Sequence, residues 1–91
     1  MPQQFINSPT WGKVVRAFIR SEMTKKSVDY PELSRRLKEL GTIQTADNLR
    51  QKVTKGILGT QLFFQICLVL KVRQFDWELI EELCESNDDV K

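Results

Sequence analysis

The chain contains 91 residues, with 14 Lys and Arg against 12 Asp and Glu, which gives a formal net charge of +2. This length predicts one domain with a modest hydrophobic core. Because the sequence has no histidine, it excludes metal sites built on His ligands and offers no His to activate a Ser or Cys nucleophile. We therefore expect a binding protein without a cofactor rather than an enzyme.

The charge is distributed unevenly along the chain. Residues 1–75 carry thirteen Lys and Arg against five Asp and Glu, a net +8, whereas residues 76–91 carry one Lys against seven acids, a net −6. A basic body with an acidic C-terminal segment predicts that the body faces a polyanion and that the C-terminus points away from it.

Two further features bear on the compartment. Cys67 and Cys84 lie on apolar helical faces, which favours small core residues in a reducing cytosol over a disulfide. The N-terminus lacks the pattern of a signal peptide, and the longest apolar stretch, 62–70, is too short to cross a bilayer. We expect a cytoplasmic protein with no membrane partner.

Residues 1–9 predict an irregular arm, whose Phe5 and Ile6 could dock on the core or swap onto a partner. Thr10 is the expected cap of a first helix that runs to about Lys26. An apolar stripe at helical spacing supports this helix: Trp11, Val14, Val15, Phe18, Ile19 and Met23. Lys13, Arg16 and Arg20 fall near its opposite side, and Lys25 and Lys26 lie at its negative end.

The next helix is predicted from Pro31 to Leu40. Asp29 is its expected cap, Glu32 completes the spacing of a capping box, and Gly41 ends the helix because glycine tolerates the left-handed conformation. The apolar stripe of this helix consists of Leu33, Leu37 and Leu40.

A third helix, Ala46 to Lys55, is predicted between a Thr45 cap and a Gly56 stop. Leu49 and Val53 point inward. The opposite side is polar and carries Gln44, Asp47, Asn48, Gln51, Thr54 and Lys55, with Arg50 and Lys52 on the flanks. Amides can bond base edges and cations can neutralise phosphates, which indicates a DNA-contacting face. The alternative is an ordinary solvated surface helix.

Beyond a short loop at 56–59, Thr60 is the expected cap of a fourth helix, Gln61 to Lys71. This segment is apolar nearly all round, which predicts burial on most sides at the centre of the core. Asp76 caps a last helix, Trp77 to Glu85. Its predicted inward residues are Trp77, Ile80, Leu83 and Cys84, and its outward residues are Glu78, Glu81, Glu82 and Glu85. Residues 10–85 thus form an all-α, five-helix domain, and 86–91 a disordered acidic tail.

The order of these elements resembles the phage-repressor-like helix-turn-helix domain. The resemblance covers roughly residues 10 to 85 and is carried by 29–33, by 45–53, by Lys55-Gly56 and by 60–72. It implies a five-helix bundle of the lambda-repressor-like helix-turn-helix type. Ser34 is followed four positions later by Lys38 rather than by a glycine, and Gly41 comes later, which predicts an extended second helix and a looser turn.

The sequence is similar, more closely still, to a small bacterial family of unassigned function. The matching residues are Tyr30, Glu32, Leu33, Arg36, Leu37, Leu40, Gly41, Asn48, Leu49, Arg50, Lys52 and Gly56.

From this resemblance and the residues themselves we expect a DNA-binding transcriptional regulator that acts by occupying an operator or promoter. The expected base-contacting residues are Gln44, Asn48 and Gln51. The expected phosphate-contacting residues are Thr45, Arg50, Lys52, Lys55, Arg35, Arg36, Lys25 and Lys26. For any single Lys or Arg, the alternative is that its charge serves only solubility. It is the cluster of these residues that indicates DNA binding.

The expected partner is double-stranded DNA, bound by a possible homodimer formed through the last helix, with Trp77 and Ile80, or through the arm. No small-molecule ligand is indicated. The alternative is a protein-interaction module, an adaptor or inhibitor on the same fold, which the acidic last helix and the loose turn favour. RNA binding is a weaker option, because the sequence has no evident aromatic stacking platform.

Overall fold

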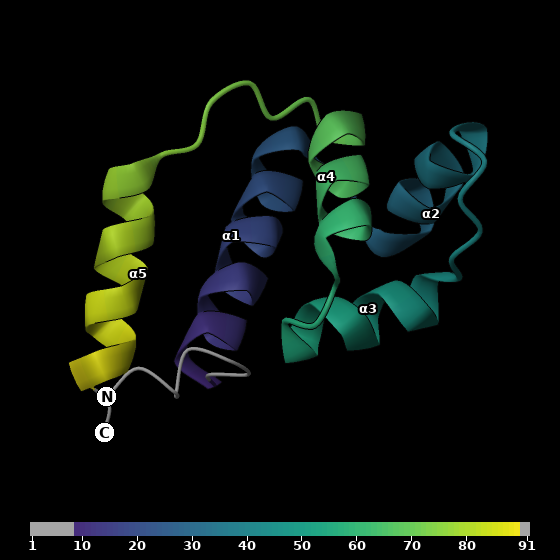
Figure 1. Ribbon diagram of the computed structural model, residues 1–91. Helices are drawn as coiled ribbons and strands as arrows, with labels where there is room; N and C mark the ends of the chain where they lie inside the picture. Colours follow the sequence, from purple (N-terminus) through teal and green to yellow (C-terminus); the bar gives the residue numbers. More distant parts are fainter. Residues whose placement is uncertain (1–8, 90–91) are drawn as a thin grey trace.

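The computed structural model describes the backbone of residues 9–89 and the side chains of residues 11–84. This part of the chain forms five helices and no strands, which confirms the all-α prediction (Figure 1). The expected docking of Phe5 and Ile6 lies outside the described residues. The helices are α1 (Pro9–Lys26), α2 (Tyr30–Glu39), α3 (Ala46–Lys55), α4 (Thr60–Val69) and α5 (Trp77–Asp89).

Asp29 and Thr45 cap α2 and α3, as predicted. The Asp29 carboxylate accepts from the backbone N–H of Glu32 at 3.0 Å, and the Thr45 hydroxyl accepts from that of Asn48 at 3.0 Å. Gly56 ends α3 in the left-handed conformation, at φ +69°. Only one of the two hydrogen bonds of the predicted capping box at α2 forms. The Glu32 carboxylate accepts from Arg35 and Arg36 rather than from the backbone N–H of Asp29.

Other helix boundaries differ from the prediction. Helix α1 begins at Pro9, and proline suits a first helical position, so Thr10 lies inside the first turn rather than capping it. Helix α4 begins at Thr60 with Gly59 as its cap, so the Thr60 cap was also wrong. It ends before Lys71, which takes a positive φ of 60°.

Asp76 caps α5 as predicted, because its Oδ1 atom accepts from the backbone N–H of Leu79 at 3.1 Å. The helix continues past the predicted end at Glu85 as far as Asp89, so most of the segment predicted as a frayed tail is helical.

The core lies between α1, α2, α3 and α4. Its most deeply buried side chains are Ile19, Leu33, Leu37, Leu49, Val53, Ile66 and Leu70. Cys67 is also buried, and burial raises the pKa of its thiol to about 11, while Cys84 is half-buried.

Five apolar residues that were predicted to face inward are exposed instead. Phe64 and Leu68 of α4 are 61% and 65% exposed, Trp77 of α5 is 66% exposed, and Trp11 of α1 and Leu40, just beyond α2, are about half exposed. The backbone of α4 approaches only that of α2, and α5 packs against α1 alone among the helices. A small domain has too few helices to surround α4, so one apolar side of α4 faces solvent.

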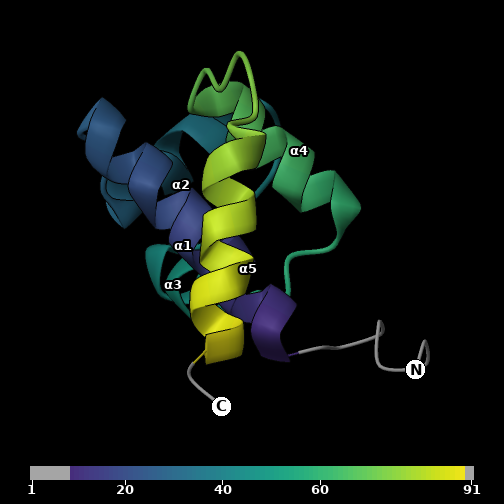
Figure 2. The same cartoon turned by 90° about the vertical axis from the view of Figure 1, so that its left-hand side faces the viewer.

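Helix α3 lies below the lower end of α4 and beside the lower end of α1, against which it packs (Figure 1). Helix α5 lies along α1 on the side away from α2 and is joined to α4 by an arching connector (Figures 1 and 2). Within residues 9–89, none of the helices is long and apolar enough to cross a membrane.

A close backbone contact fixes how α1 and α3 cross. A Cβ atom on Gly56 would clash with the carbonyl oxygen of Gly12, and one on Gly12 would lie 2.9 Å from the carbonyl oxygen of Lys55. The first turn of α1 therefore rests directly on the last turn of α3. This contact brings the polar side of α1 next to α3.

Candidate nucleic-acid interface

Helix α3 presents an exposed polar face, as the sequence predicts. Leu49 and Val53 are completely buried and anchor the helix to the core. Asn48, Gln51 and Lys55 are exposed on the other side. Their amides and ammonium group are therefore accessible to a macromolecular partner. The single packing geometry on which the DNA prediction depends, an anchored helix with its amides in solvent, is present.

The turn before α3, residues 40–45, is held by its own hydrogen bonds. The Ser34 hydroxyl donates to the carbonyl oxygen of Gln44 at 2.5 Å, and Thr42 Oγ1 donates to Gln65 Oε1 of α4 at 3.0 Å. Gln44 is half-buried, and its side-chain oxygen accepts from Lys52 Nζ at 3.2 Å. This turn is longer than the roughly three to four residues common between such helices, which agrees with the predicted loose turn.

The cations of α3 differ in how far they are engaged. Arg50 Nη1 lies 2.5 Å from Asp47 Oδ1, and the Arg50 guanidinium also lies 5.9 Å from the centre of the Tyr30 ring. Lys55 has no ion pair among the described side chains. Arg50 would thus have to exchange Asp47 for a phosphate, whereas Lys55 is already available.

Two arginines that the sequence analysis did not assign to the site lie beside α3. Arg16 Nη1 donates to the carbonyl oxygen of Thr54 at 3.3 Å, and Arg20 Nη2 donates to its hydroxyl at 3.2 Å. Neither arginine has a carboxylate partner among the described residues. The four-residue spacing of Arg16 and Arg20 predicted that both lie on the polar side of α1. That this side meets α3 is determined only by the contact of Gly12 with Gly56.

The remaining predicted phosphate contacts are engaged elsewhere. Arg35 pairs with Glu32 and Glu39, each at 2.7 Å, and Arg36 pairs with Glu32 at 2.8 Å. Arg36 also donates to the carbonyl oxygen of Val69 at 3.0 Å. These arginines therefore brace α2 and the end of α4.

The lysines at the end of α1 are also engaged. Lys26 donates to the carbonyl oxygens of Leu70 at 2.6 Å and Lys71 at 3.1 Å. The buried Glu22 carboxylate lies 3.0 Å from Lys25 and 3.7 Å from Lys26. The end of α1 lies away from α3 (Figure 1). Lys25 and Lys26 therefore cannot join the surface that α3 presents, a separation that the sequence could not reveal.

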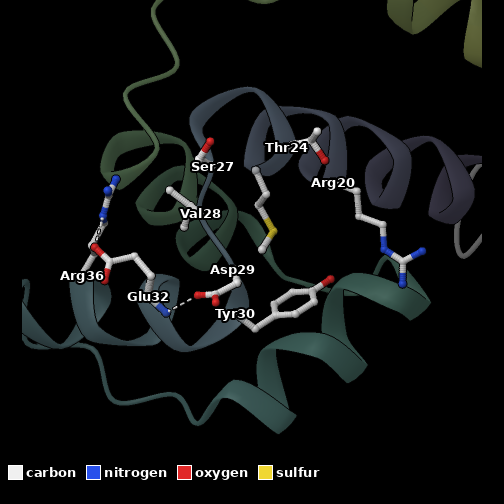
Figure 3. A pocket seen from close by; sticks show the side chains of 9 residues that line it. Arg20, Thr24, Ser27, Val28, Asp29, Tyr30, Glu32 and Arg36 are labelled. Atoms are coloured by element: carbon white, nitrogen blue, oxygen red, sulfur yellow. Dashed lines mark hydrogen bonds and ion pairs between the residues drawn. The ribbon is translucent and has the colours of Figure 1, made fainter.

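A wide, open hollow of about 870 Å³ lies between α1 and α2, and Figure 3 shows Arg20, Asp29, Tyr30, Glu32 and Arg36 around it. The Tyr30 hydroxyl is buried and has no hydrogen-bond partner among the described residues. Of the charged side chains around the hollow, Glu32 and Arg36 pair with each other, Asp29 caps α2, and Arg20 donates to Thr54. Among the described residues, no group of three His, Cys, Asp or Glu side chains could hold a metal ion.

The two arginines lower the pKa of Glu32 from its ordinary value of 4.5 to about 2, chiefly because Arg35 and then Arg36 donate hydrogen bonds to the carboxylate. A lowered folded-state pKa adds stability that is present above pH 4.5 and is lost as the pH falls from about 4.5 towards about 2. We expect Glu32→Gln to flatten the pH dependence of the melting temperature in that range. A matched Glu81→Gln variant, at an exposed site, should keep the wild-type slope; equal slopes for wild type and Glu32→Gln would contradict this assignment.

Comparisons with known proteins give one match. The model of a domain of unknown function, DUF6471, matches residues 11–75, which comprise nearly all of α1, the next three helices and the connector to α5. No curated protein and no solved structure matches the chain. The match covers more than half of the sequence and includes α3 and both arginines beside it, so the chain belongs to the DUF6471 family.

Proposed function

We propose that this protein binds duplex DNA through α3 and acts as a helix-turn-helix transcriptional regulator that occupies an operator or promoter. The observation that carries the proposal is the exposed amide-bearing face of α3, anchored by Leu49 and Val53 and bordered by Arg16 and Arg20. The order α2, turn, α3 and the apolar α4 supports a fold of the lambda-repressor-like type, with a longer turn than is common.

Base recognition falls to the exposed amides of α3. Asn48 and Gln51 each offer a donor and an acceptor, which suits the paired N6 and N7 atoms of adenine in the major groove. Gln44 takes part from the turn with its side-chain NH₂ group as a donor, while its oxygen accepts from Lys52 in the free protein. Thr45 caps α3 and brings the N–H groups of its first turn towards a phosphate.

The DNA phosphates are neutralised by the cations of α3 and by those beside its C-terminal end. Arg16 and Arg20 have no carboxylate partner among the described side chains, and Lys55 has no ion pair there. Their charge is therefore free to attract phosphates, while Arg50 and Lys52 would exchange internal partners for DNA oxygens. Each neutralised phosphate releases counterions, so binding should weaken steeply with salt.

A titration of labelled duplex DNA followed by fluorescence anisotropy tests this proposal. Arg16→Ala with Arg20→Ala should weaken binding to all sequences and reduce the slope of log K against log salt by about 1 for each lost contact. Asn48→Ala with Gln51→Ala should instead alter the base preference, at about 1–3 kcal/mol of discrimination for each good contact.

The matched control is Lys25→Ala with Lys38→Ala, which removes the same charge from exposed sites outside α3 and the turn before it. This pair should leave DNA affinity nearly unchanged. If the two charge-removing pairs weaken binding equally, the attraction is a general property of a basic chain and α3 is not the site. If wild-type protein retains no duplex of any sequence at low salt, the DNA-binding proposal is wrong.

The exposed apolar side chains of α4 and α5 favour a second function, that of a protein-interaction module. Phe64, Leu68 and Trp77 are each more than half exposed, and large exposed apolar patches commonly mark interaction surfaces. An adaptor or inhibitor would capture one protein partner, and nuclease treatment would leave that capture unchanged. In both readings the role is binding rather than catalysis, in keeping with a sequence that has no histidine.

A further inference from the structure

The exposed surface of α5 combines an aromatic side chain with negative charge. Trp77 is 66% exposed, and its ring lies 5.8 Å from that of Phe75. Glu78, Glu81 and Glu82 are exposed and form no ion pair among the described side chains. Glu81 lies one helical turn after Trp77, on the same face of α5. We call this the α5 surface.

A complementary surface lies at the end of α4. Leu68, Lys71, Val72 and Arg73 line a hollow of about 340 Å³. Leu68 is 65% exposed, and neither Lys71 nor Arg73 has an ion pair among the described side chains. The backbone of Lys71 is held in place, because its carbonyl oxygen accepts from Lys26 and its N–H donates to the carbonyl oxygen of Leu68. We call this the α4 hollow.

The two surfaces do not meet within one chain. Helix α5 packs against α1 and does not approach the backbone of α4 (Figures 1 and 2). One chain therefore carries an aromatic side chain beside carboxylates and, separately, an apolar hollow beside cations. Opposite charges on two such surfaces steer association and fix its register, while the apolar anchor supplies buried area.

We propose that the α5 surface of one copy docks in the α4 hollow of a second copy. Trp77 enters the hollow against Leu68 and Val72, and Glu78 and Glu81 face Lys71 and Arg73. The cations also lie where they can contact the face of the indole. The contact joins two different surfaces, so it is head-to-tail and leaves an unused surface at each end, which allows further copies to add.

This assembly leaves the candidate DNA-binding face uncovered. Helix α3 lies at the end of the molecule opposite the connector that carries Arg73 (Figure 1). The inference goes beyond the proposed DNA-binding function and does not depend on it. A chain that binds no DNA would still assemble in this way.

Sedimentation velocity of the full chain without DNA tests the contact. The weight-average sedimentation coefficient should rise with protein concentration at about 50 mM NaCl and should fall towards the monomer value at about 500 mM, where exposed charges are screened. Two charge-reversal variants, Lys71→Glu with Arg73→Glu and Glu78→Lys with Glu81→Lys, should each weaken association by about tenfold or more.

Mixing the two variants gives the sharper test. The reversed hollow of the first should pair with the reversed α5 surface of the second, and the native surfaces left on each should pair in turn, so association returns in the mixture. A matched control, Lys13→Glu with Lys38→Glu, changes the net charge as much as the hollow variant does and should associate like wild type. Circular dichroism checks that each variant folds.

Three outcomes overturn the proposal. Wild-type protein could remain a monomer at all concentrations at low salt. The mixture could fail to associate although both variants fold. Association could also persist at high salt and in both variants, which would assign it to a different, apolar interface.

Discussion

The replacement of Gly56 by alanine is expected to lower the free energy of unfolding by about 3 kcal/mol, one of the largest effects of any single change in this chain. Two causes add. The left-handed φ of +69° costs a residue with a Cβ atom about 1–2 kcal/mol. The new methyl group would also meet the backbone of Gly12, which cannot move aside as a side chain can. Urea unfolding followed by circular dichroism at 222 nm measures the loss.

Gly41→Ala is the matched control for this prediction. Gly41 follows α2 with the same pair of backbone hydrogen bonds that Gly56 and Ile57 make at the end of α3, and its φ is also positive, at +93°, but a Cβ atom there would meet no atom within 4 Å. Its replacement should therefore cost only the conformational part, about 1–2 kcal/mol. The excess loss in Gly56→Ala measures the contact between α1 and α3. Equal losses for the two variants would mean that this contact does not hold the two helices at a fixed distance.

Leu49→Ala is expected to destabilise the protein by about 2–5 kcal/mol, because it removes a completely buried side chain from the base of α3 and leaves a cavity. The matched control is Leu68→Ala, the same chemical change in another helix at a site that is 65% exposed. It should cost less than about 1 kcal/mol. Urea unfolding measures the loss of stability in both variants. A large loss for Leu68→Ala would contradict the exposed position of that side of α4.

The local features of this fold were predictable from the sequence because they depend on neighbours in the chain. Asp29 and Thr45 cap their helices through N–H groups three residues away, and Gly56 ends α3 by its own conformation. The inward direction of Leu49 and Val53 followed from helical spacing alone. The polar face of α3 was therefore correctly predicted as exposed.

The features that the sequence missed depend on which helices meet. Hydropathy predicted a buried α4, but no helix covers the side that carries Phe64 and Leu68. Charge alone could not separate Lys26, which binds carbonyl oxygens at the end of α4, from Arg16 and Arg20, which border α3. The packing of α1 decides where those three cations lie. Gly12 fixes this packing, and the sequence around Gly12 carries no distinctive pattern.

The attachment of α5 to α1 alone gives the molecule an unequal distribution of local stability. The family match ends at residue 75, one residue before the cap of α5, so the shared unit comprises the four helices that enclose the core. A sub-global opening that releases α5 would break contacts with α1 alone among the helices and would leave α3 fixed on its support. We expect the C-terminal helix to open as a cooperative unit separate from the four-helix core.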